Sequence, residues 1–62
     1  MEEKKMDYDR RKLLEMLAEL REARDELVSS QQPSHARLVA LAITDMESAD
    51  NWLMRAMNTP LG

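Results

Sequence analysis

Apolar residues recur at helical spacing along two long segments of this chain, which one short polar stretch separates. The stretch Ser29 to Gln32, followed by Pro33, breaks the pattern once, and Thr59 to Gly62 ends it. No glycine or proline interrupts either long segment. The pattern therefore predicts two helices, at about residues 7–28 and 35–58.

The connection between these helices predicts how they are arranged. Ser34 is the expected N-cap of the second helix, because its hydroxyl can accept a bond from an early backbone N–H, and Pro33 discourages helix just before it. A turn of about five residues between long helices favours an antiparallel pair. We expect an all-α, two-helix hairpin that forms a single domain over residues 1–62.

The first predicted helix has one apolar side. Leu13, Leu17, Leu20 and Leu27 fall at spacings of three, four and seven residues, and the remaining surface carries many charges.

The second predicted helix is apolar over a wider surface, with two adjacent stripes. The first is a heptad seam through Val39, Ala42, Met46, Ala49, Leu53 and Ala56. The second contains Ala36, Ala40, Ile43, Met54 and Met57. One stripe can face the first helix, and the other would be exposed in a monomer, which is typical of an interface. We expect the second helix at the centre of a homo-oligomeric helical bundle.

Size and composition favour the same conclusion. A chain of 62 residues builds only a small core, and natural proteins of this size add disulfides, a metal or further copies of themselves. The sequence has no cysteine, and His35 is its only histidine, so oligomerisation is the remaining route. No run approaches the roughly 18 apolar residues of a membrane helix. The charged start lacks the apolar region of a secretory signal, so we expect a cytoplasmic protein that binds no membrane.

Two arginines lie where the first helix should be apolar. Arg10 and Arg24 stand seven residues on either side of Leu17, in the same register. Taken singly, each is best interpreted as burying its methylenes while the charge reaches solvent. The alternative is that they flank a pocket and bind an anion, because the planar guanidinium suits phosphate oxygens. Arg21, one step round the helix, could bind from the rim.

Three other residues have both a structural and a binding interpretation. Tyr8 is one of two aromatic residues; it could stack on a nucleobase, although such a residue more often covers core. Trp52 is expected to pack, with a partner for its indole N–H. Thr44 could bond the carbonyl four residues earlier or line a cavity at a symmetry axis.

Catalytic signatures are weak. Asp45, Glu47 and Asp50 spread around the second helix and lack a histidine at the spacing of metal motifs, and His35 has no activated nucleophile beside it. The only glycine is terminal, so there is no phosphate loop. We expect a protein that is not an enzyme and has no metal and no cofactor.

The second helix resembles the C-terminal helix of a family of small phage proteins, the anti-CBASS and anti-Thoeris nucleotide sponges. The matching residues are Leu41, Ala42, Ile43, Thr44, Met46, Glu47, Trp52, Arg55, Ala56 and Pro60. The resemblance covers about residues 35–60, and Arg37 stands where the family places a basic residue. The family's domains are helical hairpins that form multimers such as hexamers and sequester the host's immune signalling nucleotides.

The resemblance implies that this chain is a non-catalytic sponge for cyclic oligonucleotide or cyclic ADP-ribose-type signals. It would block antiphage defence in the cytoplasm of an infected bacterium. A hexamer is favoured, with a trimer or a dimer as the alternatives. Tyr8 would stack a base, and Arg21 or Arg24 of a neighbouring subunit would bind phosphate. Arg37 and Thr44 would form a second site for a larger or three-fold cyclic oligonucleotide.

Two other functions compete with this one. A structural or adaptor helical oligomer would use the same apolar face to dock on a partner protein. An RNA-binding hairpin dimer would need a basic face, whereas the basic residues near the start are interleaved with acids and the net charge is −3. We therefore expect no binding to nucleic acid polymers.

Overall fold

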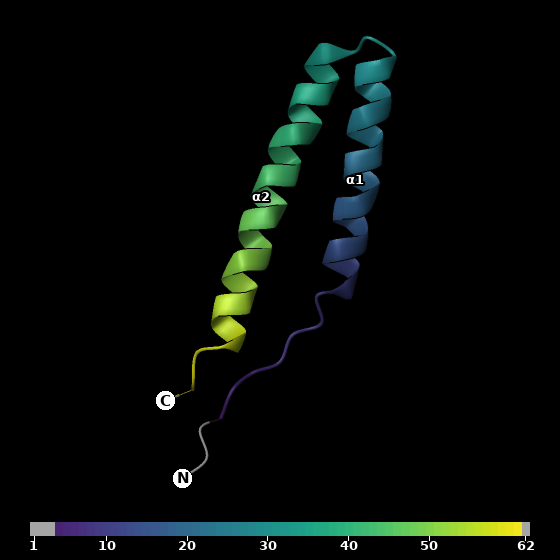
Figure 1. The fold of residues 1–62 in the computed structure, drawn as a ribbon. Helices are drawn as coiled ribbons and strands as arrows, with labels where there is room; N and C mark the ends of the chain where they lie inside the picture. Colours follow the sequence, from purple (N-terminus) through teal and green to yellow (C-terminus); the bar gives the residue numbers. More distant parts are fainter. Residues whose placement is uncertain (1–3, 62) are drawn as a thin grey trace.

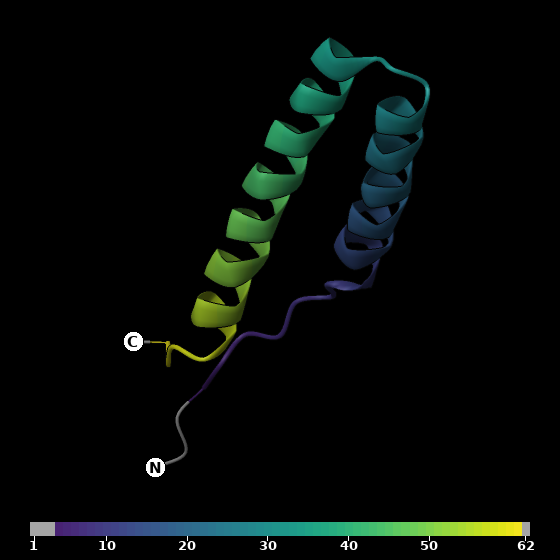
Figure 2. The same ribbon diagram turned by 45° about the horizontal axis from the view of Figure 1, so that its top comes forward.

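The protein is an antiparallel helical hairpin. The computed structural model describes residues 4–61, and within this range it contains two helices and no strand. Helix α1 spans Arg11–Ser29 and helix α2 spans Pro33–Met57. Figures 1 and 2 show the two helices side by side, joined by a short turn, with the chain's first and last segments together at the opposite, open end. The all-α hairpin predicted from the sequence is confirmed.

The hairpin is long and thin. Its principal extents are 57 × 16 × 8 Å and its radius of gyration is 15.9 Å, whereas a compact chain of this length has a radius of about 11 Å. Few side chains are consequently shielded: the buried ones are Leu17, Ala36, Ile43 and Asp50. No helix within residues 4–61 is long and apolar enough to span a membrane.

The side of α2 that faces α1 combines members of both predicted stripes. It follows a heptad through Ala36, Val39, Ile43, Met46, Asp50, Leu53 and Met57, all buried or half-buried. The expectation that one of the two predicted stripes faces the first helix is therefore wrong, and Ala42, Ala49 and Ala56 are exposed. The difference arises because Asp50, a carboxylate, occupies one of the positions that face α1. A pattern built from apolar residues alone leaves this position out and so identifies the wrong set of facing residues.

Helix α1 begins later than predicted, at Arg11 instead of about residue 7. The Asp9 carboxylate accepts a bond from the backbone N–H of Arg11 at 3.0 Å, a local turn that competes with helix. The preceding segment, residues 4–10, instead lies beside the end of α2 (Figure 1). There the backbone N–H of Leu61 donates to the carbonyl of Lys4 at 2.7 Å, which joins the two chain ends.

A Schellman motif ends α1. The N–H of Gln32 donates to the carbonyl of Leu27 at 2.8 Å, and the N–H of Gln31 donates to the carbonyl of Val28 at 3.1 Å. This geometry requires a left-handed residue, and Gln31 takes it with φ of 58°. Glycine is the usual residue there because a Cβ is unfavourable in this conformation.

Helix α2 begins directly after this motif. Gln32 is the N-cap, and Pro33 occupies the first helical position, where its missing N–H costs no hydrogen bond. The prediction of Ser34 as N-cap is wrong, because the helix already contains it. Helix α2 ends at Met57, one residue before the predicted end.

The left-handed residue generates a stability prediction. Replacing Gln31 with glycine removes a Cβ penalty of about 1–2 kcal/mol and adds a backbone entropy cost of about 0.5–1 kcal/mol. We expect Gln31→Gly to raise the free energy of unfolding by roughly 0.5–1 kcal/mol in urea denaturation. Gln32→Gly is the matched control, because Gln32 has a φ of −112°, and it should lower stability. Equal effects of the two variants would contradict this assignment of strain.

Candidate functional site

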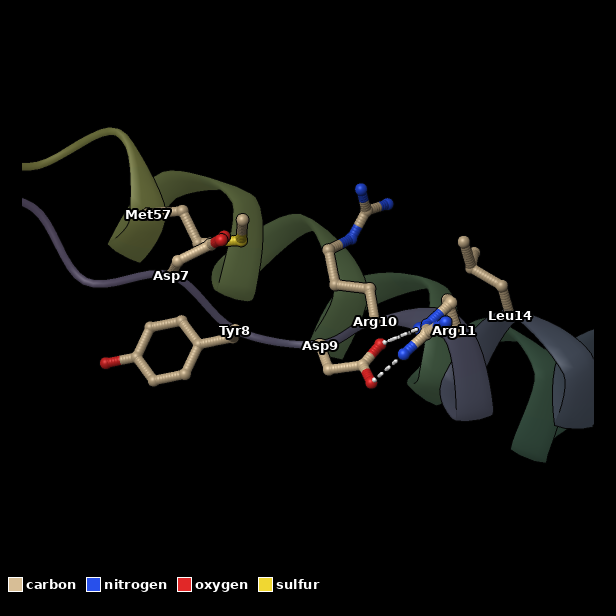
Figure 3. A pocket seen from close by; sticks show the side chains of 7 residues that line it. All are labelled: Asp7, Tyr8, Asp9, Arg10, Arg11, Leu14 and Met57. Carbon is tan, nitrogen blue, oxygen red and sulfur yellow. Dashed lines mark hydrogen bonds and ion pairs between the residues drawn. The ribbon is translucent and has the colours of Figure 1, made fainter.

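The predicted binding residues Tyr8 and Arg10 line one open hollow where residues 4–10 meet α1 and the end of α2. Its volume is about 590 Å³, and the residues around it are Asp7, Tyr8, Asp9, Arg10, Arg11, Leu14 and Met57. Figure 3 shows the Tyr8 ring and the Arg10 guanidinium on different sides of the backbone. Tyr8 and Arg10 therefore line the same hollow, but their side chains do not point toward one another.

The Arg10 side chain forms an ion pair with Asp50 of α2. Its Nε donates to Oδ1 and its Nη2 donates to Oδ2, which makes the contact bidentate. Asp50 is only 8% exposed, and the Arg10 side chain is half-buried beside it. This contact joins residues that are forty positions apart in the sequence. It holds the segment before α1 against the half of α2 that lies farther from the turn.

The ion pair changes the interpretation of Arg10. The hydrogen bonds from Arg10 hold the pKa of the Asp50 carboxyl below its ordinary value, and the same contact raises the pKa of Arg10. Two of the Arg10 donors are already bonded to Asp50, so Arg10 has a structural role, which was not predicted from the sequence. Anion binding by Arg10 stays a prediction. The sequence did carry a signal for this ion pair. Arg10 lies seven residues before Leu17 and Asp50 lies seven residues after Ile43, so two opposite charges occupy heptad positions of the two apolar patterns.

Tyr8 is exposed on the rim of the hollow. Beside it, the Asp9 carboxylate accepts bonds from the Arg11 guanidinium at 3.0 and 3.1 Å (Figure 3), and these bonds lower the pKa of Asp9. The surface next to Tyr8 therefore carries a neutralised pair and the further carboxylate of Asp7. A stacking partner can approach the ring, but this hollow itself supplies little free positive charge.

The other predicted arginines on α1 lie far from Tyr8. Arg24 stands fourteen residues beyond Arg10, which is about 21 Å along the helix. Its guanidinium contacts Asp25 at 3.4 Å, and that of Arg21 contacts Glu47 of α2 at 3.3 Å. Both are exposed or half-buried ion pairs of the kind that contributes little to stability. A single chain does not bring Tyr8 together with Arg21 or Arg24.

Arg37 and Thr44 are exposed on one side of α2, seven residues apart, or about 10.5 Å along its axis. The Thr44 hydroxyl donates to the carbonyl of Ala40 at 3.1 Å, as its structural interpretation predicted. Within residues 4–61, Arg37 forms no ion pair. The two residues share a surface in one chain but do not form a cluster.

Trp52 does not pack in the core, so its expected role is wrong for the single chain. It is 65% exposed, because it lies on the outer side of α2, away from the heptad that faces α1. The Arg55 guanidinium lies over its ring, 4.9 Å from the centroid. This cation–π contact was not predicted, although a spacing of three residues on a helix allows it.

A second group of exposed residues lies on the same outer side of α2, nearer the turn. We call Leu38, Leu41, Ala42 and Ala49 the outer apolar face; Leu38 is 64% exposed and Leu41 is 55% exposed. The exposed Asp45 lies among them, four residues after Leu41 and four before Ala49. Large apolar side chains exposed in a row on a short chain are typical of an interface. As regards metal chemistry, no group of three His, Asp or Glu residues within the described part of the chain is arranged to hold an ion.

Comparison of the chain with known protein families, with curated proteins and with solved structures found no match.

The Arg10–Asp50 pair predicts how stability changes with pH. Because the pKa of Asp50 is lower when folded than when unfolded, the unfolded chain binds more protons in acid, and stability falls as pH drops through the folded pKa. We expect the urea midpoint to be level near neutral pH and to decrease once the pH falls below about 5, through the ordinary pKa of an aspartate and on through the lower folded pKa of Asp50. The decrease should be smaller in Asp50→Asn. Asp45→Asn, which removes an exposed carboxylate of the same helix, should retain the wild-type slope; equal slopes in all three proteins would contradict the assignment.

Proposed function

We propose that this protein is a non-catalytic sponge that binds cyclic oligonucleotide or cyclic ADP-ribose-type immune signals and thereby blocks a host's antiphage defence. The proposal rests on the resemblance of residues 35–60 to the phage sponges and on the outer apolar face, which a second copy would cover. A sponge needs tight binding by many small sites, and it performs no reaction. It would act in the cytoplasm of the infected bacterium.

The outer apolar face is the observation that carries the proposal. Leu38 and Leu41 expose more than half of their surface in the single chain. Burying such side chains stabilises an assembly by about 25 cal/mol per Å² of apolar surface. The small side chains of Ala42 and Ala49 lie in the same row and allow a helix to approach closely. These features favour a homo-oligomer. Among the possible assemblies we prefer the hexamer, on the resemblance to the phage sponges alone, with a trimer or a dimer as the alternatives.

Assembly would also complete a binding site. Tyr8 lies at the open end, whereas Arg24 lies toward the turn, about 21 Å along the helix from Arg10. Two hairpins packed in antiparallel orientation would place the open end of one beside the turn half of the other. A base stacked on Tyr8 would then lie within reach of Arg21 or Arg24 from the neighbouring subunit.

Arg37 and Thr44 suit a second kind of site. Both are exposed, and Arg37 has no ion pair among the described residues. Copies of this pair brought together around a symmetry axis would form a ring of guanidiniums and hydroxyls, suited to a three-fold cyclic oligonucleotide. The net charge of −3 does not prevent this, because charges more than about 8 Å away are largely screened.

Two substitutions test the nucleotide site. Tyr8→Ala removes the stacking ring, and Arg24→Glu places a negative charge where phosphate should bind, so we expect each to abolish binding of the recognised cyclic nucleotide in calorimetric titration. Lys12→Glu is the control, because it makes the same charge change on an exposed part of α1. The oligomer mass should be unchanged in all variants. Wild-type affinity in both Tyr8→Ala and Arg24→Glu would overturn the site assignment.

One substitution tests the interface. Leu41→Glu introduces a charge into the outer apolar face, and we expect it to dissociate the oligomer in sedimentation velocity while the helical circular dichroism is retained. Ala18→Glu introduces the same charge on the exposed surface of α1 and should leave the assembly intact. If Leu41→Glu sediments like the wild type, this face is not the interface.

The adaptor function remains the second candidate, since the outer apolar face fits a partner protein as well as a second copy. An adaptor would bind that partner as a separate polypeptide and would not respond to nucleotides. In that case Arg24 and Arg37 would be ordinary surface charges, and the variants at Tyr8 and Arg24 would have no effect on partner binding.

A further inference from the structure

Both aromatic residues of the chain line one hollow at the open end. Tyr8 comes from the segment before α1 and Trp52 from the last turns of α2. The hollow has a volume of about 440 Å³ and is lined by Met6, Tyr8, Trp52, Arg55, Ala56, Thr59, Pro60 and Leu61. Among the described residues, its wall is therefore mainly apolar and aromatic, with one positive charge and no carboxylate. That combination is suited to an aromatic anion.

The Arg55 guanidinium is oriented for a second interaction. Its Cζ lies over the Trp52 ring at 4.9 Å from the centroid. A guanidinium carries its N–H donors in its plane, and stacking leaves these edge donors able to bind phosphate oxygens in bidentate fashion. Within residues 4–61 no carboxylate forms an ion pair with Arg55.

We propose that this hollow binds one base-plus-phosphate unit of a nucleotide, with the base against Tyr8 and Trp52 and the phosphate on the edge of Arg55. The proposal rests on the proposed function and refines it, because it assigns a subsite to residues of one chain. A cyclic oligonucleotide has more than one phosphate, so Arg24 of a neighbouring subunit would bind another. The volume lies within the range of small-ligand sites, about 300–1,000 Å³.

The single tryptophan makes the subsite measurable in the full chain. AMP should quench Trp52 fluorescence in a saturable manner, because its base stacks beside the indole. Adenosine, which lacks the phosphate, and ribose 5-phosphate, which lacks the base, should each bind at least about tenfold more weakly.

Variants identify the groups responsible. Arg55→Gln should weaken AMP binding about tenfold by removing the charge, whereas Lys12→Gln, which removes the same charge from an exposed part of α1, should have no effect. Tyr8→Phe should retain binding and Tyr8→Leu should lose about tenfold, because stacking needs an aromatic ring. All three positions are exposed, so the helical circular dichroism of the four variants should stay unchanged.

Several results would overturn the subsite. They are equal quenching by all three compounds, equal AMP affinity of Arg55→Gln and Lys12→Gln, or a Trp52 emission that changes with protein concentration alone, which would show that a second copy covers the ring. Failure of the sponge function is distinguishable: AMP would still quench Trp52 through Arg55, while no cyclic nucleotide would bind. If a cyclic nucleotide binds the wild type and Arg55→Gln equally, the sponge stands and this subsite is wrong.

Discussion

The ion pair between Arg10 and Asp50 holds together the part of the molecule on which the proposed sites depend. It is the charged contact within an otherwise apolar seam, and it ties residues 4–10 to α2. Removing one partner would leave a charge shielded from water without its counterion, which is a costly state. Shifting α1 along α2 by one helical turn would also separate the two charges. The ion pair therefore favours a single register of the two helices.

That register decides which side chains face outward. The heptad through Ile43 and Asp50 turns toward α1, so Leu38, Leu41 and Trp52 are left on the opposite side. In a hairpin only two helices thick, nothing else in the chain can cover them. The same contact holds Tyr8 at the open end, on the side of the segment away from Arg10 (Figure 3). The outer surface and the open-end hollows are thus consequences of one internal contact.

Periodicity was sufficient to predict the hairpin, because two uninterrupted apolar patterns and one proline-marked break allow few other folds. The boundaries were less accurate where local polar contacts compete with helix, as Asp9 does before α1, and where Gln31 takes a conformation usually left to glycine. Asp50 was missed because a carboxylate in a seam looks like a surface residue until its partner is known. The sequence indicated Tyr8 and Arg10 as separate binding candidates. Their meeting at one hollow, and the ion-pair partners of Arg21 and Arg24, depend on the tertiary register. The periodicity of one chain indicates that a surface is apolar, but it does not specify which residues of a neighbouring subunit would contact that surface.

The central claim is that this hairpin works as an assembly that captures a signalling nucleotide. Native mass spectrometry against cyclic dinucleotides, cyclic trinucleotides and cyclic ADP-ribose isomers tests it most directly, because it measures subunit number and ligand stoichiometry together. The account predicts a defined multimer, preferably a hexamer, that carries one ligand for each pair or each trio of subunits. A monomer, or a multimer that binds none of these nucleotides, would contradict it.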